Sequence, residues 1–305
     1  MKKSVQLYVF LIISLLYSLI VLLGPSDSAT LQRYHMTQGK AHLLSLTVVI
    51  PFLIIWLIAY SGYAAFRRYS QVVQDSPEGP AFNQFSYGLM ILTFGLPVNS
   101  LTDATLNYII YHHASYTVPL TIIRNYSTLL ITLVAFLSIS LGAEGLSKIV
   151  KKKAASSTSP KPRIWPIAII AVSSLFSWLI IARPIAGNKA DAVYAMPNVY
   201  IIATLAIPYL YAWYRGALAV VYVMHYLKNV KGRLYREALR FIAAGITSVI
   251  AINVFVQLII TISPKLSRLH FTPIFTVIYL LIAMYAVAFG FIAKGANQLK
   301  KIEEV

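Results

Sequence analysis

Two apolar segments that repeat each other decide the fold: TVVIPFLIIWLIAY at residues 47–60 and TLAIPYLYAWYRGA at residues 204–217. Displaced by 157 positions, they share Thr, Ile, Pro, Leu and Trp at the same places. Neither segment alternates apolar with polar residues, so both are predicted to be helices rather than strands of a membrane barrel. One difference stands out, because Arg215 in the second copy replaces Ile58 in the first.

Composition predicts that these helices lie in a membrane. The chain of 305 residues is 58% hydrophobic and 11% charged, with a mean hydropathy of +0.71, whereas soluble domains carry about 25% charged residues. Since about 20 apolar residues span a bilayer as a helix, we predict an all-α integral membrane protein. The eight predicted transmembrane helices are 5–23, 43–66, 84–111, 118–141, 164–183, 198–226, 241–263 and 272–293.

The net charge of +17 is distributed unevenly between the predicted loops. Most of the 26 lysines and arginines follow the even-numbered spans or lie near the chain ends, as in KIVKKKAASSTSPKPR at 148–163 and KNVKGRLYREALR at 228–240. Because basic loops stay cytoplasmic, we expect a cytoplasmic (inner) membrane protein with both termini inside. The same loops are predicted to attract anionic headgroups. They lack interleaved aromatic residues, so we expect no nucleic acid partner.

Further matches indicate that the whole chain is a tandem duplication. Gly88 matches Gly245, and GAEGLSKI at 142–149 matches GANQLKKI at 295–302. We therefore predict two four-helix repeats, related by a parallel pseudo-two-fold axis along the membrane normal. Their bounds are 1–149 and 164–305, with a basic cytoplasmic linker at 150–163. The first span resembles a signal peptide, but its counterpart in the second repeat favours a retained helix.

Polar side chains inside the spans are the candidate functional residues, because such groups are costly in lipid and face the bundle interior. Asn99, Asp103 and Asn107 recur every four residues and share one face of the third helix. Asn253 and Gln257 form a similar stripe on the seventh helix at an offset of 154. Either the stripes hydrogen-bond helices together, or they line a polar cavity that opens outward.

Two basic residues lie within the spans. Arg124 is expected at the depth of Asp103 in an antiparallel hairpin, where the pair is either a structural salt bridge or an ion-responsive switch. Arg215 lies too deep for its side chain to reach the inner boundary easily, and Glu144 is its best candidate partner. It is either packed among tyrosines or part of a site for an anion or lipid headgroup.

Several functions have little support in the sequence. The chain has no cysteine, which excludes disulfides and thiolate sites, and it contains no zinc-protease, nucleophile-elbow or phosphate-loop motif. We therefore name no catalytic residue, metal ligand or cofactor. The connection predicted between spans at 67–83 is too short to bury a core.

Three functional hypotheses remain. The first is a permease-like transporter with a polar path between the third and seventh helices, lined by the candidate residues Asn99, Asp103, Asn107, Arg124, Arg215, Asn253 and Gln257. The second is a non-transporting sensor, subunit or scaffold that binds partner membrane helices. The third, with the least support, is a membrane enzyme acting on lipid. The sequence names neither a substrate nor a coupling ion.

Overall fold

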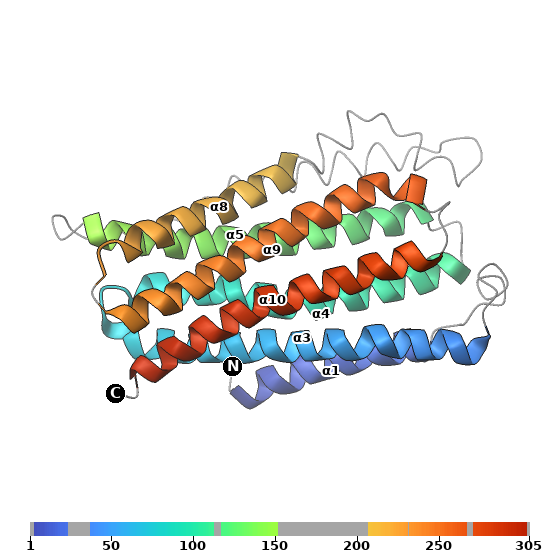
Figure 1. Ribbon diagram of the computed structural model, residues 1–305, viewed down its shortest axis with the longest axis horizontal. Helices are drawn as coiled ribbons and strands as arrows, with labels where there is room; N and C mark the ends of the chain where they lie inside the picture. Colours follow the sequence, from blue (N-terminus) through green and yellow to red (C-terminus); the bar gives the residue numbers. More distant parts are fainter. Residues whose placement is uncertain are drawn as a thin grey trace.

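The chain is all-helical in the residues that the computed structural model describes, which are 3–23, 37–112, 117–151, 207–230, 232–266 and 271–303 (Figure 1). The elements are α1 (Lys3–Leu23), α3 (Gln38–Val72), the short 3-10 helix η1 (Val73–Asp75), α4 (Gly79–His112), α5 (Thr117–Lys151), α8 (Ile207–Leu227), α9 (Arg233–Leu266) and α10 (Phe271–Glu303). The end of α10 lies near the left edge of Figure 1, and the start of α1 lies in the same half, nearer the middle.

The length and composition of these helices fit a membrane-embedded protein. Within the described residues, 4 segments are long and apolar enough to cross a membrane: Ser45–Asp75, Ser127–Val150, Arg233–Val256 and Val277–Ile302. A shorter apolar helix covers Val5–Val21. The predicted fifth span, 164–183, and most of the predicted linker, 150–163, lie outside the described residues.

The connection predicted at 67–83 is mostly helical. Helix α3 continues through Arg67 and Arg68 to Val72, and α4 begins at Gly79 after η1 and a short turn. Charged residues mark where an apolar span ends, but Arg is itself a good helix former, so the helix extends beyond the apolar stretch.

Six helices form a closed ring. Helix α3 packs on α4 and α10, α5 packs on α4 and α8, and α9 packs on α8 and α10. The most extensive contacts are α4 with α5, α9 with α10, α3 with α10, and α5 with α8. The ring therefore contains two tightly packed hairpins, α4/α5 and α9/α10. Helix α3 lies between α4 and α10, and helix α8 lies between α5 and α9.

The hairpin α4/α5 is held by two glycines that allow the helix backbones to approach closely. A Cβ on Gly88 of α4 would lie 2.7 Å from the Ile139 nitrogen and 2.8 Å from the Ala135 carbonyl oxygen of α5. In return, a Cβ on Gly142 of α5 would lie 2.6 Å from the Ala81 carbonyl oxygen of α4. Such close approach of small residues is the usual means of packing helices in lipid.

The hairpin α9/α10 uses the same arrangement. A Cβ on Gly245 of α9 would lie 2.7 Å from the Ala288 carbonyl oxygen and 3.1 Å from the Ile292 nitrogen of α10. A Cβ on Gly295 of α10 would meet the Ala238 carbonyl oxygen of α9. Each hairpin thus has, on each helix, a glycine at which the backbone of the opposite helix comes close.

Helix α1 contacts α3 and α4 and lies along the lower edge in Figure 1. Its buried aromatic residues form a second small core with α3, in which the Tyr17 and Trp56 rings are 5.0 Å apart at 64°. Gln6 also donates a hydrogen bond of 3.4 Å to the Tyr63 hydroxyl. Helix α1 is thereby attached to the ring by aromatic packing and one polar contact.

Candidate functional site

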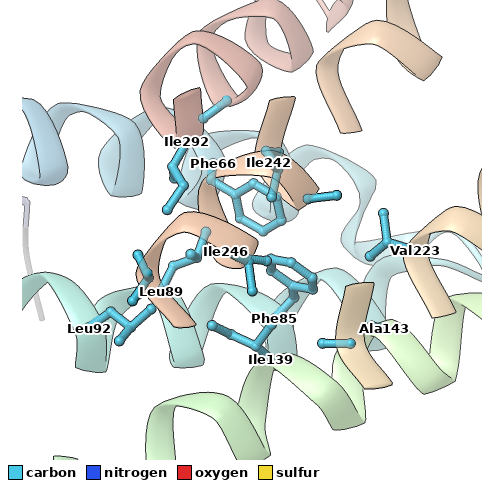
Figure 2. Packing of buried hydrophobic residues seen from close by; sticks show 14 of the residues in the cluster. Phe66, Phe85, Leu89, Leu92, Ile139, Ala143, Val223, Ile242, Ile246 and Ile292 are labelled. Carbon is cyan, nitrogen blue, oxygen red and sulfur yellow. The ribbon is translucent and has the colours of Figure 1, made fainter. Parts of the chain in front are cut away.

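Apolar side chains fill the seam between α4 and α9 towards the basic end of the ring. Phe85, Leu89 and Leu92 of α4 and Ile242 and Ile246 of α9 belong to one buried cluster (Figure 2). All five are at most 6% exposed. Over this length the seam between α4 and α9 is filled by apolar side chains.

Two predicted site residues have described side chains farther along these helices. Thr128 of α5 donates a hydrogen bond of 2.6 Å to the Asn99 side-chain oxygen of α4. The Asn253 side-chain amide donates a 2.9 Å hydrogen bond to the Val249 carbonyl of its own helix, α9. Asn99 therefore joins α4 to α5, which is the structural role that polar groups commonly have between membrane helices.

For four other predicted site residues, the structure describes only the backbone. Asp103 and Asn107 belong to α4, Arg124 to α5 and Gln257 to α9, but their side chains lie outside the described part of the structure. The pairing of Asp103 with Arg124 therefore stays a prediction.

Arg215 of α8 is the most unusual polar residue that the structure describes. It is only 5% exposed, and its Nε and Nη2 atoms are buried without a hydrogen-bond partner. The expectation that Glu144 pairs with it is wrong, because the Glu144 carboxylate binds the Lys148 ammonium at 2.7 Å. Leaving a buried charge unpaired typically costs on the order of 3–5 kcal/mol. Packing alone therefore does not account for this arginine.

Neighbouring contacts place Arg215 deep in the ring. A Cβ on the adjacent Gly216 would lie 3.3 Å from the Phe136 ring of α5 and 2.8 Å from the Ile250 side chain of α9. Along α8, Arg215 lies about 18 Å from the helix end at Leu227, at 1.5 Å per residue. The backbone of Arg215 is thus at mid-depth of α8, next to the point where α5, α8 and α9 meet.

Polar groups continue from this point along the α5/α8 contact towards the basic end. Phe136, Ser140 and Ser147 share one face of α5, because they are separated by four and seven residues. Ser140 is fully buried, and its hydroxyl has no partner. The Ser147 hydroxyl is 3.0 Å from Nδ1 of His225 on α8. The contact between α5 and α8 therefore carries polar groups at three depths.

Ser140, Ser147 and His225 were not among the residues predicted from the sequence. A signal for Ser140 was present, since the matching segment of α10 has Ala293 at the corresponding position, 153 residues later. The Ser147–His225 contact had no such signal, because it depends on which helices are neighbours in the ring.

The described residues offer no group of three or more His, Asp or Glu side chains able to hold a metal ion. Polar atoms that are buried and unpaired within this part of the chain are Ser140 Oγ, Trp213 Nε1, Arg215 Nε, Arg215 Nη2 and Gln298 Oε1. The chemistry that the α5/α8 contact can supply is therefore hydrogen-bond donation and one positive charge. Comparison with protein-family models, with curated proteins and with solved structures found no match for this chain.

Proposed function

We propose that the protein is a multi-pass membrane permease for a small anionic solute, and that Arg215 is the group that binds this solute. One observation carries the proposal: Arg215, at mid-depth of α8, is 5% exposed and has two guanidinium nitrogens without partners. Ionisable groups in such positions mark substrate and ion pathways in membrane proteins. A transported anion would supply the hydrogen-bond acceptors and the negative charge that the described residues around Arg215 do not.

The architecture proposed for this permease is two tandem four-helix repeats with eight spans. The glycine contacts of the two hairpins support it, because Gly88 and Gly245 meet carbonyl oxygens of Ala135 and Ala288, which are themselves 153 residues apart. The order of helices around the ring supports it as well. Exchanging α3 with α8, α4 with α9 and α5 with α10 reproduces every contact of the ring. In this proposal α1 corresponds to the span at 164–183.

The solute path proposed here follows the α5/α8 contact, with Asn99, Asp103, Asn107, Asn253 and Gln257 closer to its outer end. Substrate sites in repeat transporters lie near the midplane, where the repeats meet, and α5/α8 is one of the two places where the proposed halves touch. Ser140 and Ser147 continue from Arg215 towards the basic end. The basic end is taken to face the cytoplasm of an inner-membrane protein, in accordance with the positive-inside rule.

The test is flux through the purified full chain in proteoliposomes, with a panel of halides, oxyanions and small carboxylates. We expect one class of anion to cross, and Arg215→Gln to lower its flux about tenfold or more, as for the loss of a charged hydrogen bond in a buried site. Arg215→Lys should retain part of the flux. Arg233→Gln is the matched control, because this arginine is exposed and pairs with Glu237 at 3.0 Å.

Two outcomes would contradict the proposal. Wild-type flux at the level of empty liposomes for every anion would rule out the permease. Equal flux in wild type and Arg215→Gln, with both proteins folded, would remove Arg215 from the path.

A second function is supported by a different observation, the packed apolar seam between α4 and α9 (Figure 2). A bundle with a filled core fits a non-transporting sensor, subunit or scaffold that binds partner helices. Affinity capture of the tagged protein from its native membrane distinguishes the two functions. A stoichiometric membrane partner together with absent flux would favour the scaffold.

A further inference from the structure

A group of aromatic and basic side chains lies on the outer side of α9 and α10, near the basic end. The Lys294 ammonium of α10 is 4.1 Å from the centre of the Phe241 ring of α9. That ring stacks on Phe291 of α10, with centroids 6.0 Å apart and an angle of 24° between the planes. A cation held over an aromatic face is fixed in position and still attracts an anion.

Further polar residues lie close to this stack along α9 and α10. Arg240, which precedes Phe241, is exposed, and so is Arg236 one turn away on the same face of α9. One turn beyond Lys294, the side-chain oxygen of Gln298 is buried and has no hydrogen-bond donor. Positive charges thus lie at the surface, and a hydrogen-bond acceptor without a donor is buried nearby, where a ligand hydroxyl reaches it only if the Gln298 side chain turns outward.

The proposed repeat provides a comparison for this surface on the first hairpin, α4/α5. The residues that correspond to Arg240, Phe241, Phe291, Lys294 and Gln298 are Asn83, Gln84, Ser138, Leu141 and Gly145. None of them is cationic or aromatic, although the two hairpins share their glycine contacts. The close packing of a hairpin therefore does not require the aromatic and basic side chains found on α9 and α10.

We infer that α9 and α10 form a binding site for one anionic glycerophospholipid whose headgroup carries free hydroxyls, as in phosphatidylglycerol. The lipid phosphate binds Arg240 and Lys294, a headgroup hydroxyl donates to Gln298 Oε1, and the acyl chains lie along the apolar outer faces of α9 and α10. Basic residues at this level of a membrane protein meet the phosphates of the cytoplasmic leaflet. This inference rests on the membrane orientation proposed above but not on transport.

The experiment is native mass spectrometry of the purified full chain in a neutral detergent. Phosphatidylglycerol, phosphatidic acid and phosphatidylcholine of the same chain length are titrated separately, and the affinity of the first bound lipid is measured. We expect the tightest binding with phosphatidylglycerol, a loss of about fivefold for Lys294→Gln or Arg240→Gln, and about 25-fold for both together. Soluble glycerol 3-phosphate should not displace the lipid, because it lacks the chains.

Two control variants keep the inference falsifiable. Lys148→Gln removes one positive charge from the first hairpin, and it should leave the affinity within about twofold because surface charges there act only at long range. Gln298→Leu should reduce the preference for phosphatidylglycerol over phosphatidic acid while the protein stays folded. The inference is overturned if Lys294→Gln and Arg240→Gln weaken binding no more than Lys148→Gln, or if phosphatidylcholine binds equally well. Flux measurements are independent of either result.

Discussion

The two most extensive contacts between the proposed halves of the molecule are α3 with α10 and α5 with α8, and they differ in polarity over part of their length. In the first, a Cβ on Gly62 would lie 2.8 Å from the Ala293 Cα, so the two backbones nearly touch. Ile58, one turn away on α3, is a partly buried member of the core. Over this length the α3/α10 contact is apolar and close.

The α5/α8 contact is its counterpart under the proposed repeat, yet it holds polar groups at the same positions. Arg215 corresponds to Ile58, and Ser140 corresponds to Ala293. Both polar residues are buried with unpaired atoms. Over the matched length, α3 and α10 are therefore joined without a polar group, and their hydrogen bond between Thr47 and Tyr279 (2.6 Å) lies farther towards the other end. The unpaired atoms of Arg215 and Ser140 are expected to reduce stability, and we propose that these residues are present for binding rather than for folding.

The largest effect on the apolar contact should come from Gly62→Leu. The added side chain must enter a gap in which even a Cβ would lie 2.8 Å from the Ala293 backbone. Overpacking a close contact costs about 1–3 kcal/mol and occasionally more, so we expect a loss of about 3 kcal/mol. Thermal unfolding of the purified protein, followed by intrinsic fluorescence, measures it.

Gly290→Leu is the control for this prediction. It lies on α10, as Ala293 does, but a Cβ there would meet nothing within 4 Å. We expect no loss of stability, since leucine favours a helix more than glycine does. Similar losses in the two variants would show that the close approach at Gly62 is not what holds α3 to α10.

The next effect has the opposite sign and concerns the polar contact. Arg215→Ile installs the residue found in the counterpart helix and removes a buried, unpaired charge. Replacing buried ionic groups by hydrophobic ones stabilises proteins by about 1–4 kcal/mol in favourable cases, and we expect a gain in this range without added anion. The thermal midpoint in detergent should rise, whereas anion flux should be lost.

The reciprocal variant sharpens this comparison. Ile58→Arg places a charge in the apolar contact, where insertion into the membrane centre costs about 2.5–3.5 kcal/mol. We expect it to lower the thermal midpoint. If Arg215→Ile instead lowers stability, the guanidinium is a structural element and the binding role is wrong.

These comparisons also show what could be predicted from the sequence. The segment 47–60 is helical in α3, and the segment 204–217 is helical from Ile207 onward in α8, as predicted. Comparison of the two segments also singled out Arg215 as the position at which a charge replaces an apolar residue. The seven described helices lie within or around predicted spans, because apolar length is a property of each segment alone. The matches of Gly88 with Gly245 and of Gly142 with Gly295 marked residues at which the helices meet.

Contacts between distant segments could not be predicted in the same way. Ser147 and His225 meet because α5 and α8 are neighbours in the ring, and nothing in either segment specifies that neighbour. The polar stripes illustrate a related difficulty. The hairpin glycines relate α4 to α9 by 157 residues, and both helices are continuous. An offset of 157 residues aligns Asn99 with Val256 rather than with Asn253. The polar residues that match at an offset of 154 residues therefore lie about one helical turn apart in the two helices.

A smaller effect is expected at the basic end of the polar contact. Ser147→Ala removes the 3.0 Å contact with His225 and should cost about 1 kcal/mol, the usual net value of one hydrogen bond. Chemical denaturation in mixed micelles measures the difference. Ser138→Ala on the same helix is the control, because the Ser138 side chain makes no hydrogen bond within the described structure. Its effect on the free energy of unfolding should be close to zero. Equal effects at the two serines would mean that the contact with His225 contributes nothing.

The smallest effect on stability, and the sharpest test of the comparison, is expected for Ser140→Ala. This substitution installs the residue of the apolar contact, Ala293, at the matching position of the polar one. Because the Ser140 hydroxyl is buried without a partner, its loss should leave stability within about 0.5 kcal/mol or raise it slightly. Flux of the transported anion should nevertheless fall, since the hydroxyl is the first polar group beyond Arg215 along α5. Unchanged stability with reduced flux would show that the Ser140 hydroxyl contributes to solute binding and not to folding. Unchanged flux would show that the solute path does not follow the α5/α8 contact.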